Sequence, residues 1–259
     1  MKSIVCSSVK GGTGKTKVTA GIGKALARMG KQVALADYDY FAPNLDVELH
    51  TDGAELGGDG FGKIIPAKTQ EGIEFVSLGL IYLQDQAVLV SEEAAIRDIL
   101  QLQSQIRWDS PDYLIIDTAP TSSAVIQTSL RAPNLLGTVI VTQPSRVSRA
   151  DLLRSFSLMK DKRIPILGVV INQAYYVCSQ CGYQEQIYDL NSNNIEKLCD
   201  DWGVPVLGVV PHSQNLDGHF DDLANKIIKG TPVVLPEEKK PSEVPVRLVS
   251  WLKKIMSKK

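Results

Sequence analysis

The sequence is short of several features that define whole classes of protein. It has 4 cysteines in 259 residues, too few for a disulfide scaffold in a chain of this length. Its 28 lysines and arginines are balanced by 29 aspartates and glutamates, which excludes a chain-wide basic field, so no specific nucleic-acid partner is expected. No apolar run approaches the ~20 residues of a membrane span, and residues 1–6 lack the apolar core of a signal peptide. We therefore expect a cytoplasmic globular protein.

Short apolar runs alternate with amphipathic stretches along most of the chain. β-Branched runs between segments of helical periodicity are typical of parallel strands that are covered by helices on both faces. The pattern predicts an α/β fold with a doubly wound, mostly parallel sheet. The expected strands lie at 4–6, 33–35, 74–76, 113–116, 138–141, 168–171 and 206–210, and the expected helices at 15–29, 92–107, 123–131, 148–160, 193–202 and 215–228.

The remaining segments suggest one domain with a tethered end. Residues 1–235 are expected to form the domain, with irregular loops at the glycine-dense segment 53–62 and the polar segment 172–194. Residues 236–259 are expected to form a linker and an amphipathic C-terminal helix with several lysines and no acidic residue on its last turns. Such a helix can lie on an anionic membrane, or it can pack on the domain with solvated lysines.

The strongest motif is KGGTGKT at residues 10–16, which follows the first expected strand and opens the first expected helix. Glycines let successive N–H groups converge on an anion, and the helix N-terminus adds partial positive charge. Lys15 is expected to reach the β- and γ-phosphates, and the Thr16 hydroxyl to bind Mg²⁺. The predicted nucleotide-binding residues of the loop are Gly11, Gly12, Thr13, Gly14, Lys15 and Thr16.

The loop departs from the usual pattern G-x-x-x-x-G-K-S/T in an informative way. Val9 stands where that pattern has glycine, and an additional lysine, Lys10, precedes the glycines. KGGTGKT resembles the deviant Walker A motif of the ParA/MinD/Mrp group of P-loop ATPases, which have the SIMIBI (MinD-like) P-loop NTPase fold. The resemblance implies that Lys10 reaches the partner's phosphates across a nucleotide-sandwich homodimer.

Two acidic strand ends extend the resemblance. The segment DYDYFAPN at 37–44 is similar to switch I, which implies that its second aspartate, Asp39, positions the attacking water. The alternative is a pair of exposed loop carboxylates without chemistry. Asp117 ends an apolar strand similar to Walker B, which implies a Mg²⁺ ligand, direct or through water. Residues 117–124 depart from the group's switch II pattern, and slow, switch-type hydrolysis is expected.

The strand ends further along the chain match the base-binding residues of this group. Asn172, which ends the strand GVVIN, matches the asparagine that reads the adenine edge. Pro211 and His212 match the loop that flanks the base. The resemblance therefore implies ATP as the nucleotide, while a purely structural asparagine at a strand end is the alternative.

Cys178 and Cys181 form a CxxC pair followed by glycine, a spacing that lets two thiolates bind one metal. A complete site needs four such ligands, and neither Cys6, in the first strand, nor Cys199, in an expected helix, obviously supplies them. Two chains related by a two-fold axis would present four thiolates, which suits a bridging [4Fe-4S] cluster or Zn²⁺. A zinc staple of the dimer and a redox-active pair are the alternatives.

Residues 166–182, ILGVVINQAYYVCSQCG, resemble the segment PVLGVVENMSYFxCPxCG of the Mrp/Nbp-type iron–sulfur cluster carrier ATPases. The resemblance implies an ATP-binding and ATP-hydrolysing protein that holds a bridging [4Fe-4S] cluster at a homodimer interface and transfers it to apo iron–sulfur proteins. The alternative function is that of a ParA/MinD-type positioning ATPase that acts at a membrane or on DNA without a cluster.

Overall fold

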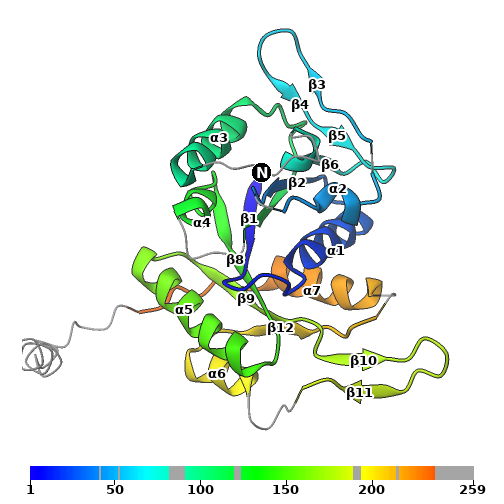
Figure 1. Ribbon diagram of the computed structural model, residues 1–259, viewed down its shortest axis with the longest axis vertical. Coiled ribbons are helices and arrows are strands. Elements are labelled where there is room, and N and C mark those ends of the chain that lie inside the picture. Colours follow the sequence, from blue (N-terminus) through cyan, green and yellow to red (C-terminus); the bar gives the residue numbers. More distant parts are fainter. Residues whose placement is uncertain are drawn as a thin grey trace, which may run out of the picture.

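An eight-stranded sheet in the order β12-β9-β8-β1-β7-β2-β6-β5 organises the chain (Figure 1). The structure, a computed structural model, describes residues 1–40, 42–51, 53–81, 91–119, 124–188, 194–213 and 216–236. The strands are β1 (Lys2–Ser7), β2 (Val33–Tyr38), β5 (Ala67–Lys68), β6 (Glu74–Ser77), β7 (Tyr113–Thr118), β8 (Leu135–Thr142), β9 (Ile166–Ile171) and β12 (Val206–Val209). All neighbours pair in parallel except β5, which is antiparallel to β6. The predicted mostly parallel sheet is confirmed.

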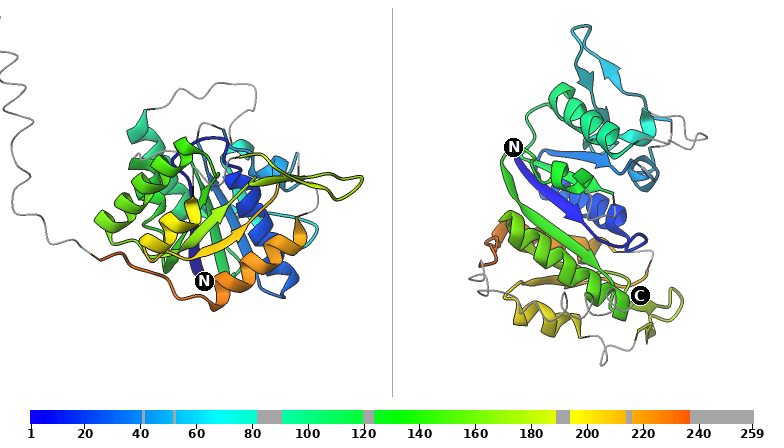
Figure 2. Two further views of the ribbon diagram at one scale, coloured as in Figure 1. Left: turned by 90° about the horizontal axis from the view of Figure 1, so that it is seen from below. Right: turned by 60° about the vertical axis from the view of Figure 1, so that its left-hand side comes forward.

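Helices cover both faces of the sheet (Figures 1 and 2). One face carries α1 (Lys15–Arg28), α2 (Leu45–Glu48) and α7 (Asp217–Lys229), and the other carries α3 (Glu92–Gln105), α4 (Ala124–Ser129), α5 (Arg146–Lys162) and α6 (Ile195–Asp201). Alternate side chains of β1 supply the two cores, since Ile4 and Cys6 pack in one and Val5 in the other. This arrangement confirms the doubly wound fold.

β1 lies in the middle of the sheet, between β7 and β8. The next strands in the chain, β2, β5, β6 and β7, all lie on one side of β1. The chain then crosses to the other side, where β8, β9 and β12 lie. In open α/β sheets ligands bind beyond the carboxyl ends of the strands, near such a reversal of strand order. The loop after β1, which carries KGGTGKT, begins at this position.

Two segments predicted to be irregular contain hairpins instead. In the glycine-dense segment, β3 (Gly57–Gly58) pairs with β4 (Ile64–Ile65) just beyond it. In the polar segment, β10 (Tyr175–Val177) pairs with β11 (Gln184–Gln186), and this hairpin projects away from the sheet (Figures 1 and 2). The hairpins were not predicted, because β3 and β11 have no apolar residues and β4 and β10, although apolar, are only two and three residues long.

The predicted C-terminal helix lies outside the described residues, which end at Pro236. None of the helices within the described ranges is long and apolar enough to cross a bilayer.

Helix α1 packs closely on α7, and a glycine permits it. A Cβ atom at Gly21 would overlap the ring of Phe220. We expect Gly21→Ala to lower the free energy of unfolding by about 1–3 kcal/mol, because the helices must separate. Urea unfolding measures the change. Gly218→Ala in α7 is the matched control, since its Cβ would meet nothing within 4 Å; equal stability of Gly21→Ala and the parent would contradict this packing.

Candidate functional site

The loop between β1 and α1 has a backbone that glycine alone accommodates well. Gly12 and Gly14 have φ values of 75° and 77°, in the left-handed region. Gly14 is also the N-cap of α1, and a Cβ there would overlap the side-chain amide of Asn172. The curled loop therefore depends on its glycines, as the motif predicted.

Three side chains bind carbonyl oxygens of this loop and hold its shape. The Ser8 hydroxyl donates to the Lys10 carbonyl at 3.0 Å, and the Gln143 amide donates to the Gly12 carbonyl at 3.4 Å. The Asn172 amide donates to the Thr13 carbonyl at 2.8 Å. The loop is thus fixed by the ends of β1, β8 and β9, three neighbouring strands of the sheet.

A cavity of about 510 Å³ lies over the loop and the start of α1. It is lined by residues 10–17 together with Asp39 and residues of the segment that leads into α2. The volume is typical of a small-ligand site, and the first turn of α1 has no acidic residue to repel an anion. The structure therefore brings the predicted loop residues Lys10 to Thr16 and Asp39 together at one cavity.

Asp117 lies at the centre of a buried polar cluster beneath the loop. Lys15 Nζ is 2.7 Å from Asp117 Oδ1, and the Thr16 hydroxyl donates to Asp117 Oδ2 at 2.6 Å. Burial lowers the pKa of Lys15, but the charge of Asp117 and its hydrogen bond outweigh burial, so the pKa of Lys15 lies above its ordinary value. Lys15 is therefore a fixed cation at the floor of the cavity.

Thr19, which was not predicted as a site residue, also belongs to this cluster. Its hydroxyl donates to Asp117 Oδ1 at 3.2 Å and to the Lys15 carbonyl at 3.0 Å. The sequence did indicate this position, because Thr19 is four residues after Lys15 and so lies on the same face of the predicted helix. Thr16 and Asp117 supply oxygen ligands, the type that Mg²⁺ prefers, so the donor set fits the predicted ion.

Asp39 and Asp37 are both buried, at 6% and 1% exposure, which overturns the alternative of exposed loop carboxylates. Asp39 lines the cavity, and its Oδ1 accepts a hydrogen bond from the Ala42 backbone N–H at 3.2 Å. The position of Asp39 opposite the loop suits the predicted role in orienting water.

Asp37 was not singled out from the sequence, yet it anchors the segment that carries Asp39. Its carboxylate accepts hydrogen bonds from the backbone N–H groups of Asp39, Asn44 and Leu45 and from the Ser77 hydroxyl, at 2.9–3.1 Å. Burial, followed by the charge of Asp117, raises the pKa of Asp37 to about 8. The sequence offered one indication of this role: Asp37 stands near the end of a predicted strand, two residues before Asp39.

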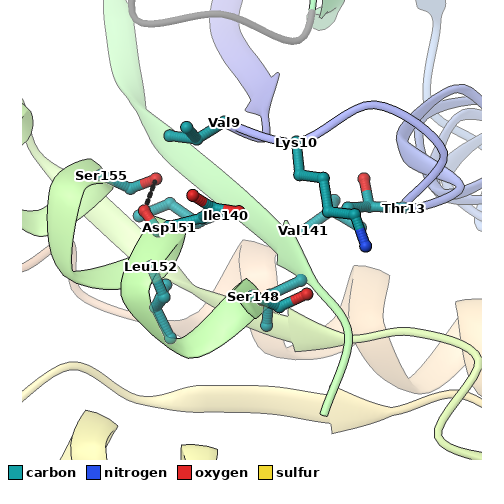
Figure 3. A pocket seen from close by; sticks show the side chains of 10 residues that line it. Val9, Lys10, Thr13, Ile140, Val141, Ser148, Asp151, Leu152 and Ser155 are labelled. Carbon is teal, nitrogen blue, oxygen red and sulfur yellow. Dashed lines mark hydrogen bonds between the residues drawn. The ribbon is translucent and has the colours of Figure 1, made fainter. Parts of the chain in front are cut away.

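The additional lysine, Lys10, is exposed beside the loop (Figure 3). Its side chain lies near Thr13 above β8, and Ser148 of α5 faces the same small gap of about 10 Å³. Asp151, also on α5, forms an ion pair with Arg154 at 2.6 Å. Within one chain Lys10 is thus available at the surface, as the predicted contact with a partner's nucleotide requires.

The predicted base-binding residues occupy different places. Asn172 contacts the loop through the Thr13 carbonyl. Pro211 and His212 follow β12 and are not among the residues that line the 510 Å³ cavity. His212 instead donates its backbone N–H to the Tyr175 carbonyl of β10 at 2.7 Å. The adenine-binding role of these three residues stays a prediction.

Cys178 and Cys181 lie at the turn of the β10–β11 hairpin. The Cys178 N–H donates to the Tyr183 carbonyl and the Gly182 N–H to the Cys178 carbonyl, both at 2.9 Å. Cys178 is half-buried and Cys181 exposed. Hydrogen bonds from the backbone of Cys181 and then Gln180 lower the pKa of Cys178, which favours the thiolate that metals bind.

The other two cysteines are chemically shielded. Cys6 and Cys199 are fully buried, and burial raises the pKa of each thiol to about 12. Across the described residues, no group of three or more His, Cys, Asp or Glu side chains is arranged to hold a metal ion. A four-thiolate site at the hairpin would therefore need a second chain.

Comparison with known proteins places these features in a family. Residues 1–246 match the family described as ParA: NUBPL iron-transfer P-loop NTPase. The chain is 32% identical over 265 residues to an iron-sulfur cluster carrier protein of Pyrococcus horikoshii, covering 97% of this chain and 87% of that protein. It is 28% identical over 233 residues to the carrier protein of Aquifex aeolicus, covering 90% of this chain but only 61% of that relative's length.

A solved structure shows the same fold. The nucleotide-binding protein of Archaeoglobus fulgidus, in complex with ADP, superposes with a TM-score of 0.68 at 24% identity and covers 87% of each chain. The match to the family model spans nearly the whole described chain, including both the loop after β1 and the cysteine hairpin. This chain therefore belongs to the ParA family of NUBPL-type iron-transfer P-loop NTPases.

Proposed function

We propose that this protein is an ATP-hydrolysing iron–sulfur cluster carrier, which holds a [4Fe-4S] cluster as cargo between two copies of the chain and transfers it to apo-proteins. The observation that carries the proposal is the CxxC pair at the tip of a projecting hairpin, in the same domain as a P-loop cavity. Membership of an iron-transfer family and similarity to an iron-sulfur cluster carrier protein support it.

The cargo site needs both copies of the chain. Each chain offers two accessible thiols, so a two-fold axis near the hairpin tips brings four thiolates together. The lowered pKa of Cys178 favours the thiolate, which is the form that binds metal. Zn²⁺ accepts the same four ligands and is the competing occupant.

At the nucleotide site the chain's own residues supply charge and position. Lys15 neutralises phosphate charge from the cavity floor, and Lys10 does so from the partner copy across the dimer. Asp39 orients the attacking water. Thr16 and Asp117 hold Mg²⁺, which when bound neutralises charge on the β- and γ-phosphates. Hydrolysis then acts as a slow switch, because loss of the γ-phosphate releases the segments it held.

Anaerobic reconstitution tests the cargo. The parent, Cys178→Ser/Cys181→Ser and the control Ser179→Ala are each treated with iron and sulfide, and visible absorbance and iron content are measured. We expect a broad brown absorbance and about four iron atoms per dimer in the parent and control, and neither in the double variant. Transfer is then followed as the gain of activity by an apo iron–sulfur enzyme.

The opposite result has a defined meaning. A colourless parent that holds zinc or no metal contradicts the carrier function and favours a positioning ATPase without a cluster. ATP-dependent sedimentation with anionic liposomes, lost on deletion of residues 246–259, would support that alternative.

A further inference from the structure

Gln173 joins the cysteine hairpin to the rest of the sheet in an unusual backbone conformation. It lies between the end of β9 at Ile171 and the start of β10 at Tyr175, and its φ is 53°. Non-glycine residues rarely adopt this left-handed region, and such positions persist where the surroundings hold them. Gln173 is thus the corner at which the chain leaves the sheet for the hairpin.

The side chain of Gln173 is bonded to the P-loop through one intermediary. The side-chain amide of Gln143 donates to the Gln173 side-chain carbonyl and also to the Gly12 backbone carbonyl. Asn172, the preceding residue, bonds the Thr13 carbonyl at 2.8 Å. Two consecutive residues at the root of the hairpin are therefore hydrogen-bonded to two consecutive P-loop carbonyls, Asn172 directly and Gln173 through Gln143.

The other edge of β10 is held as well. Ala174 donates its N–H to the Val210 carbonyl at 3.1 Å, and the rings of Tyr176 and His212 lie 6.5 Å apart. Lys17, in the first turn of α1, donates to the Ser213 carbonyl at 3.5 Å. The root of β10 is therefore attached on both sides to residues close to the P-loop and α1 and is not a loose linker.

We propose that Gln173 is a positioning residue that, through Gln143, makes the placement of the cysteine hairpin depend on the state of the P-loop. Nucleotide at the loop and metal at Cys178 and Cys181 then change each other's affinity by the same factor. The inference rests on the proposed function for its metal site.

Cobalt(II) titration measures the coupling without any catalytic readout. Thiolate-to-cobalt charge-transfer absorbance gives the Co²⁺ dissociation constant with and without saturating Mg·ADP. We expect a nucleotide-dependent change of about 5-fold or more in the parent. Gln173→Met keeps the side-chain length but removes the hydrogen-bond acceptor, and we expect its change to fall below about 2-fold. Gln184→Met, an exposed site on β11 of the same hairpin, should behave like the parent.

A double-mutant cycle tests whether the coupling passes through the hydrogen bond between Gln143 and Gln173. If the coupling passes through the amide pair, Gln143→Leu/Gln173→Met should show the same residual coupling as Gln173→Met. A purely structural role of Gln173 would weaken Co²⁺ binding equally with and without nucleotide, leaving the coupling factor unchanged, and that result overturns the proposal. The proposal is also overturned if the parent binds Co²⁺ with the same dissociation constant with and without Mg·ADP. A parent that binds no Co²⁺ at these thiols instead contradicts the proposed carrier function itself.

Discussion

Replacing Lys15 by alanine is expected to lower the rate of ATP hydrolysis by about 10²-fold or more, because a preorganised charge at the phosphates is lost. Lys15 lines the cavity, is 6% exposed and is held by Asp117 at 2.7 Å, so its charge has a fixed position at the cavity floor. Phosphate release under single-turnover conditions measures the rate, and a fluorescent nucleotide measures binding.

The control for this change lies on the same helix. Lys24→Ala removes a lysine of α1 that does not line the cavity and whose Nζ donates to the Glu48 backbone carbonyl at 3.4 Å. It should hydrolyse ATP at nearly the parent rate. Thermal melting checks that Lys15→Ala remains folded, since Asp117 keeps its hydrogen bonds from Thr16 and Thr19. A folded Lys15→Ala variant as fast as the parent would refute the mechanism.

Asp39→Asn should separate binding from hydrolysis. The amide keeps the size of the side chain and an oxygen to accept the Ala42 N–H, but it loses the negative charge that orients and polarises water. We expect hydrolysis to fall by about 10²–10⁴-fold, with ATP affinity nearly unchanged. The two quantities are measured as for Lys15→Ala.

Glu48→Gln is the matched control for Asp39→Asn. Both carboxylates line the 510 Å³ cavity, but Glu48 belongs to α2. The same chemical change should leave hydrolysis within a few-fold of the parent. If Glu48→Gln is the slower variant, the water-orienting role belongs to Glu48 and the prediction for Asp39 is wrong.

Most of the sheet could be predicted because its strands are buried on both faces. β1, β2, β7 and β9 are covered almost throughout, so their sequences are short, near-continuous apolar runs of strand length. The P-loop could be predicted equally well, since its glycines, Lys15 and Thr16 form one contiguous sequence motif. Local sequence patterns were therefore enough to predict the sheet and the P-loop side of the site.

The features that could not be predicted depend on contacts between distant residues or on strands without an apolar face. β11 is exposed along its whole length and β3 consists of two glycines, so neither has a recognisable alternation. The pairing of Gln143 with Gln173 joins residues 30 apart through flexible polar side chains. The role of Asp37 depends on hydrogen bonds from the backbone N–H groups of Asp39, Asn44 and Leu45, which no periodicity in the sequence indicates.

The unequal burial of the four cysteines has a consequence for oxidative damage. Peroxide attacks thiolates that are accessible to solvent, and Cys6 and Cys199, with pKa values raised to about 12, are neither ionised nor exposed. Oxidation is therefore confined to Cys178 and Cys181 at the hairpin tip. We expect an oxidised molecule to keep its folded sheet and its cavity while losing the two thiolates that we propose bind the cluster. A thiol reductant that converts the sulfenic acid or disulfide at these two positions back to thiols then restores it, provided that oxidation went no further.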